Sequence, residues 1–140
     1  MRLYEQTNGI RGMDVYGPVS ATAFNPSSDR NMKENFAPVE ARAVLDKVIA
    51  LPISRWNFKG DTATPHVGPM AQDFHAAFQT GSDDKHIATV DADGVALAAI
   101  QGLNQKLTEE LKRRDTENAE LKARLDRLEQ FINTRNGGGQ

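Results

Sequence analysis

Residues 94–133 read GVALAAIQGLNQKLTEELKRRDTENAELKARLDRLEQFIN, with seam residues recurring in alternating steps of three and four. This spacing is typical of a coiled coil, in which heptad positions a and d form the contact between helices. The sequence therefore predicts a long C-terminal helix that associates with other helices. We define its seam as Leu97, Ile100, Asn104, Leu107, Leu111, Arg114, Asn118, Leu121, Leu125, Leu128 and Ile132.

The charges that flank the seam indicate how the helices align. With Leu121 at position d, Glu117 faces Lys122 in the g-to-e sense, and Arg124 faces Glu129 in the same way. Opposite charges at these positions favour parallel chains in register. We therefore expect a parallel coiled coil.

Three positions of the seam carry polar side chains. Asn104 and Asn118 fall at a, where asparagine lowers stability but suppresses slipped registers and wrong oligomers. Arg114 falls at d, and we interpret it as a weak point where the helices splay. The basic run 112–114 is interleaved with acids, which predicts a solvated face of the coiled coil rather than a DNA-binding helix.

Composition limits the classes of protein that this chain can represent. It has 140 residues, 39% hydrophobic, with a net charge of −2 and no cysteine. The modest apolar fraction predicts burial shared with other chains, and the charge balance argues against nucleic-acid or membrane partners. Without cysteine there are no disulfides or thiolate zinc sites. No stretch has membrane-spanning length and no export signal is visible, so we expect a soluble protein.

The middle of the chain predicts a small unit of mixed helix and strand. Residues 39–51 carry apolar side chains at helical spacing until Pro52 ends the run, whereas residues 53–59 alternate like a strand that holds Trp56 in the core. Residues 67–72 lead into a second short helical pattern that runs through residues 73–78. By contrast, residues 1–27 are rich in turn formers and predict short strands that cannot make an independent sheet.

The run from Ser27 to Asn35 places a serine and a lysine five residues apart, directly after Pro26. A serine hydroxyl is a poor nucleophile at neutral pH, and a lysine amine held neutral by burial can take its proton. Ser28 and Lys33 are therefore candidates for a Ser-Lys dyad. Taken alone, the pair is equally typical of a solvated surface loop.

Four motifs in a fixed order are more specific than any one of them. They are SDRNMKEN at residues 28–35, a helix leading to RWNF at 55–58, HVGPMAQD at 66–73, and VDADGV at 90–95 before the long helix. This succession resembles the intramolecular chaperone autoprocessing domain at the C-terminus of phage tailspikes and tail fibres, also found in the myelin regulatory factor. The resemblance extends from residue 28 to about residue 130.

The resemblance implies a function. Domains of that family trimerise, help an intertwined β-rich passenger to fold, and cut the peptide bond before the serine of a Ser-Lys dyad. For this chain it implies that Ser28 is the nucleophile, Lys33 is its general base, and Ser27–Ser28 is the scissile bond. The family's five-residue spacing to lysine selects Ser28 over Ser27. The route, an N-to-O acyl shift with hydrolysis or another serine mechanism, stays open.

Other polar residues are candidates for supporting roles. Backbone amides, or the side chains of Asn31 or His66, could donate hydrogen bonds to the oxyanion, although a lone histidine is more often structural. Gln72 is a further candidate near the start of a helix. His75 and His86 lack partners at ligand spacing, so we expect no metal site, and nothing indicates a cofactor.

We therefore predict an α+β fold in which a small mixed globular unit precedes a long C-terminal helix that forms a parallel trimeric coiled coil. Residues 1–27 are expected to be the end of the passenger, 28–93 the globular autoprocessing domain, 94–133 the trimerisation helix, and 134–140 a disordered tail. The expected partners are two further copies and the N-terminal passenger of the same chain, with no nucleic acid or membrane.

The expected function is that of a self-cleaving serine endopeptidase and chaperone for a phage tail fibre or tailspike. The passenger would belong to the virion tail, and the released domain would remain in the host cytoplasm. Two alternatives stay open: a non-cleaving trimeric cap that only sets register, and a coiled-coil scaffold whose globular part binds another partner.

Overall fold

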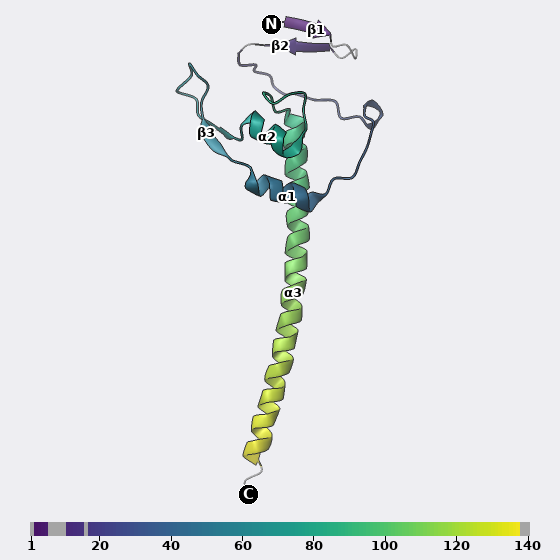
Figure 1. The fold of residues 1–140 in the computed structure, drawn as a ribbon, viewed down its shortest axis with the longest axis vertical. Coiled ribbons are helices and arrows are strands. Elements are labelled where there is room, and N and C mark those ends of the chain that lie inside the picture. The colour runs from purple at the N-terminus through teal and green to yellow at the C-terminus, as the bar shows by residue number, and fades with distance from the viewer. Residues whose placement is uncertain (1, 6–10, 16, 138–140) are drawn as a thin grey trace. The chain divides into compact units, whose positions relative to one another are not determined.

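The structure is a computed structural model that describes residues 2–5, 11–15 and 17–137. It divides into two compact units, Met1–Phe36 and Ala37–Gln140. Figure 1 gives the order of the elements along the chain.

The first unit contains one β-hairpin and one short helical turn. Strands β1 (Arg2–Glu5) and β2 (Arg11–Asp14) pair antiparallel, and a single 3-10 turn, η1, spans Arg30–Met32. Of the short strands predicted for residues 1–27, these two form, and no further strand is present in the described residues 15 and 17–27. Pro18 lacks the N–H group that a ladder needs, so alternation of side chains alone does not make a strand there.

The second unit begins with helix α1 (Ala41–Ala50), which confirms the helix predicted before Pro52. The Glu40 side chain caps its start by accepting a hydrogen bond from the backbone N–H of Arg42 at 3.3 Å. A carboxylate at this end also complements the positive end of the helix dipole. Ala41 and Leu45 are buried on its inner face.

A second hairpin and a second helix follow α1. Strand β3 (Ser54–Trp56) lies in the predicted strand region and pairs antiparallel with β4 (His66–Gly68), with Trp56 opposite His66. Strand β4 has three residues, too few for alternation to reveal it in the sequence. Helix α2 (Ala71–Phe78) ends where Gln79 adopts the left-handed conformation, with φ of 54°.

Helix α3 (Thr89–Gly137) dominates the second unit with 49 residues, a length of about 74 Å at 1.5 Å per residue. It begins before Gly94, the predicted start, because Asp91 and Ala92 already donate backbone hydrogen bonds to the carbonyl of Ala88. No described helix is both long enough and apolar enough to cross a membrane. In Figure 1 the C-terminal half of α3 extends well beyond α1 and α2.

Helix α1 crosses α3 at a point of close backbone approach (Figure 1). A Cβ atom on Gly102 would overlap the carbonyl oxygen of Ala41 and would lie 3.0 Å from Cβ of Leu45. Ala99, one turn earlier on α3, is buried in the same contact region. Small residues on α3 therefore let the two helices meet.

The face of α3 that α1 covers is not the face that carries the seam. Ala99, Gly102 and Glu109 occupy heptad positions c and f, and Arg42 of α1 forms an ion pair with Glu109 at 2.7 Å. The apolar side chains of the seam remain between 53% and 64% exposed. The chain by itself thus leaves the predicted contact surface uncovered.

Candidate active site

The turn η1 brings Ser28 and Lys33 together. Asp29 caps the turn, because its Oδ1 accepts a hydrogen bond from the backbone N–H of Asn31 at 3.0 Å. The backbone N–H of Lys33 closes the turn on the carbonyl of Arg30 at 3.1 Å. As a result Lys33 Nζ lies 2.6 Å from Ser28 Oγ and donates a hydrogen bond to it. A Ser-Lys dyad requires this proximity of hydroxyl and amine, although an amine that acts as the base accepts the serine proton instead of donating one.

The two adjacent serines have different partners. Ser27 Oγ donates a hydrogen bond to Sδ of Met32 at 3.2 Å, whereas Ser28 contacts the lysine. A thioether sulfur is a weak acceptor and cannot serve as a base for the hydroxyl. The local geometry therefore favours Ser28 over Ser27 as the residue to be activated. No sequence pattern indicates the contact of Ser27 with Met32.

The pair is open to solvent in the single chain. Every residue from Ser27 to Asn35 is exposed. A lysine amine in water is normally protonated at neutral pH, and a protonated amine cannot accept a proton from serine. A single chain thus brings Lys33 Nζ and Ser28 Oγ into contact, but it does not exclude water from them.

Asn31 lies beside the pair, but its side chain is used within the turn. Its Nδ2 donates a hydrogen bond to Asp29 Oδ1 at 3.1 Å, alongside the backbone bond to the same oxygen. This double contact stiffens the turn between Ser28 and Lys33. Donation by Asn31 to an oxyanion remains a prediction.

His66 belongs to an aromatic cluster in the second unit. Its ring stacks on that of Trp56, with centroids 4.8 Å apart and planes inclined by 29°, and meets Phe58 edge-on at 5.5 Å. Trp56 and Phe58 form a third pair at 5.0 Å. Such contacts are typical of a packing residue, which supports the structural interpretation of His66. Its role in catalysis remains a prediction.

The remaining candidates lie on or after α2. Gln72 is exposed in the first turn of the helix. Nδ1 of His75 lies 3.0 Å from the carbonyl oxygen of Thr80, and Nδ1 of His86 lies 3.0 Å from a carboxylate oxygen of Asp83. The described residues contain no group of three or more His, Asp or Glu side chains placed to hold a metal ion.

Asp83 is held as a carboxylate by its own loop. Its Oδ1 accepts hydrogen bonds from the backbone N–H groups of Lys85 at 2.8 Å and His86 at 3.0 Å. These donors, with the imidazole of His86, lower the pKa of Asp83, the bond from Lys85 contributing most. The arrangement orders the loop between α2 and α3.

Comparison with known proteins places the site within a family domain. Residues 28–81 match the family model Peptidase_S74, described as chaperone of endosialidase. The matching segment starts at Ser28 and contains Lys33, helix α1, the β3–β4 hairpin and helix α2. No curated protein matches the chain. Residues 28–81 are therefore similar to the chaperone-of-endosialidase family, which supports the resemblance to intramolecular chaperone domains.

Proposed function

We propose that this chain is a trimeric intramolecular chaperone for a phage tail fibre or tailspike passenger and that it cuts itself before Ser28. The observation that carries this proposal is the 2.6 Å contact between Lys33 Nζ and Ser28 Oγ. The match to the chaperone family begins at the same serine. Residues 1–27 then represent the end of the passenger.

The chemistry is a transfer of the Ser27 acyl group followed by hydrolysis. The neutral amine of Lys33 takes the proton from Ser28 Oγ as this oxygen attacks the carbonyl carbon of Ser27. The C–N bond then breaks, the Ser28 nitrogen receives the proton from Lys33, and an ester joins Ser27 to Ser28 Oγ. Water hydrolyses the ester, leaving a carboxylate on Ser27 and a free amino group on Ser28. In the second route, an activated serine attacks the scissile bond in another arrangement, without the N-to-O acyl shift.

Assembly would act as the switch for this reaction. Burial disfavours the charged form of an amine, so packing of other copies around the pair would favour the neutral amine that a general base must provide. A chaperone that cuts only after assembly keeps its passenger attached while the strands are still pairing. This order follows from the exposure of Ser28 and Lys33 in one chain.

Two features of the second unit support association with further copies. The buried apolar residues among those described are Ala41, Leu45, Phe74 and Ala99, a small core for a chain of this length. The apolar seam of α3 faces away from α1 and stays exposed. Packing of three seams would bury this surface, and the number three rests on the family resemblance.

Release of the chaperone gives the passenger kinetic stability. Intertwined β trimers have many contacts between distant residues and form slowly, so holding three chains in register lowers the entropic cost of pairing. Cleavage then removes the element that aligned the chains. The passenger remains folded behind its unfolding barrier.

The exposure of the pair favours one alternative, a non-cleaving cap that stays attached and sets register. Intact mass of the full chain separates the two functions when the wild type is compared with Ser28→Ala, Lys33→Ala and the matched control Ser27→Ala. Self-cleavage predicts a fragment that begins at Ser28 in the wild type and in the control, and intact chains in the other two variants. A wild-type trimer that stays whole, or a Lys33→Ala variant that is cut, would refute the dyad.

A further inference from the structure

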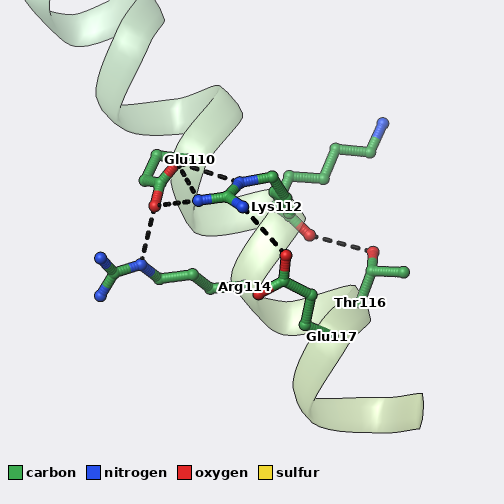
Figure 2. Close-up of polar contacts among 6 residues, drawn as sticks. Glu110, Lys112, Arg114, Thr116 and Glu117 are labelled. Carbon is green, nitrogen blue, oxygen red and sulfur yellow. Dashed lines mark hydrogen bonds and ion pairs between the residues drawn. The ribbon is translucent and has the colours of Figure 1, made fainter.

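A network of ion pairs lies on α3 just beyond the part that α1 covers (Figure 2). Glu110 accepts hydrogen bonds from Arg113, the shortest being 2.7 Å from Nη2 to Oε1. Arg114 Nε donates to the same Oε1 at 2.9 Å. Arg113 Nη1 also reaches Glu117 Oε1 at 3.0 Å. One carboxylate is thus shared by two guanidinium groups.

This network differs from ordinary surface pairs because one of its members lies on the seam. Arg114 occupies position d, between Leu107 and Leu121 at the d positions of the neighbouring heptads. Its partner Glu110 occupies the flanking position g. Asn118, the next seam residue, is polar as well, so the layers at 114 and 118 divide the seam into two blocks that are apolar except for Asn104.

The neighbouring copy would meet this layer with a second acid. In a parallel coiled coil, position g of one helix lies beside position e of the next heptad on its neighbour. Glu110 at g would therefore face Asp115 at e, and two carboxylates alone would repel each other. The guanidinium of Arg114 extends from the seam position d to Glu110, with Nε 2.9 Å from Oε1. It supplies the positive charge that makes the juxtaposition favourable.

We propose that Arg114, with Glu110 of its own helix and Asp115 of a second copy of this chain, forms a charged layer that fixes the register of the coiled coil. This inference rests on the proposed assembly of the chain and names the residues that align it. The interpretation of Arg114 as a point of splaying is the competing view.

The charged layer favours the aligned register because a slipped register would bury the guanidinium of Arg114 among apolar side chains. A shift by one heptad places Arg114 in a layer with Leu107 or Leu121 of the other helices, where its guanidinium meets leucine side chains instead of acids. Burying a charge without its partner is costly, whereas the leucine layers lose little from the shift. The charged layer therefore penalises slipped registers more than the apolar layers do.

The register can be measured with a single spin label, because the chain contains no cysteine. Ala123→Cys, at the outer position f, carries the label in full-length chains. Copies in register give one short interspin distance, and a one-heptad slip adds an axial offset of about 10 Å. Sedimentation on the same samples reports the number of chains.

We expect the otherwise native labelled chain to be a trimer with one narrow distance distribution. Arg114→Leu should remain a trimer but gain a second, longer distance, because it loses the charged layer and only the asparagine layers at 104 and 118 still oppose a slip. Arg113→Leu removes the same charge one residue away, at position c, and should keep the single distance. Arg114→Lys retains the positive charge at position d and should also give a single interspin distance.

Three results would overturn the charged layer. A single narrow distance in Arg114→Leu would place the control of register elsewhere on the seam. A broad distribution with native Arg114 that becomes narrow in Arg114→Leu would establish splaying instead. A monomer in sedimentation would refute the proposed assembly itself, and the charged layer with it, whereas a trimer tests the layer independently of whether Ser28 is cut.

Discussion

At the scale of single residues, the site depends on a short turn. Asp29 holds the backbone of Asn31, and the closed turn leaves Lys33 Nζ at 2.6 Å from Ser28 Oγ. All of these contacts join residues at most five positions apart. The turn thus brings the two groups together with little help from the rest of the chain, whereas the proposed chemistry would rely on other copies to exclude water.

Replacement of the lysine by arginine separates charge from basicity. Lys33→Arg keeps a cation and several donors next to Ser28, but a guanidinium does not lose its proton in proteins and cannot act as a general base. We expect cleavage to fall below detection in a time course of intact mass, while the oligomer size is unchanged. Lys47→Arg, the same substitution on α1, should be cut at the wild-type rate. Cleavage in Lys33→Arg would exclude the base role.

Local contacts also explain which parts of the site the sequence could predict. The pairing of Ser28 with Lys33 follows from spacing, because a single capped turn spans it. The stacking of His66 on Trp56 could not be predicted, since it depends on the register of a hairpin whose second strand has three residues. The contact of Ser27 with Met32 depends on rotamers, which sequence patterns do not encode.

At the scale of elements, the crossing of α1 and α3 depends on Gly102, and Gly94 on the same helix offers a comparison. Gly102 lies against the Ala41 carbonyl, whereas a Cβ on Gly94 would meet nothing within 4 Å. Gly102→Ala should therefore destabilise the fold by about 1–3 kcal/mol through overpacking. Gly94→Ala should stabilise it by roughly 0.5–1 kcal/mol, because alanine favours the helix.

Chemical denaturation followed by circular dichroism measures the free energy of unfolding of both alanine variants. We expect this free energy to fall in Gly102→Ala and to rise in Gly94→Ala. Equal effects at Gly102 and Gly94 would mean that helix propensity, rather than the contact with α1, determines the change. The close approach at Gly102 would then contribute nothing specific.

The ion pairs of α3 give the helix a defined response to acid. Hydrogen bonds from Arg113, and next from Arg114, lower the pKa of Glu110 from 4.5 to about 2. Because the pKa in the folded state is the lower one, the stabilisation is complete above about pH 4.5 and is lost as the pH falls toward 2. We expect wild type to have a higher Tm than Glu110→Gln at pH 7.

Thermal unfolding between pH 7 and pH 2 tests this response. The difference in Tm between wild type and Glu110→Gln should disappear at the acid end. Glu120→Gln, on the same helix but outside the network, should show a smaller difference at pH 7. A difference for Glu110→Gln that persists unchanged at pH 2 would show that the ion pairs do not cause it.

The three helices of the second unit could be predicted from periodicity, but the face that α1 covers could not. Apolar spacing identifies α1, α2 and α3, because each has one apolar side. The seam of α3 is largely apolar too, and no sequence pattern indicates that α1 packs on positions c and f instead. The packing of α1 on this face follows from the small residues Ala99 and Gly102, which permit the close approach of the two helices.

At the scale of the whole molecule, the exposed seam is the feature through which the proposed assembly would control the proposed cleavage. Leu121→Asp places a carboxylate on the seam of every copy, and buried like charges oppose association. We expect this variant to sediment as a monomer and to remain uncut. Ala123→Asp, at position f, should assemble and be cut as the wild type is. A cleaved Leu121→Asp monomer would show that assembly is not the switch.

Native mass spectrometry of the wild-type chain during assembly tests self-cleavage by an assembled chaperone most directly, because one spectrum reports chain number and chain length together. We predict intact monomers first, then intact trimers, and finally trimers of chains that begin at Ser28 alongside the released residues 1–27. Trimers that never lose residues 1–27, or monomers that lose them before any trimer is present, would contradict the proposed function.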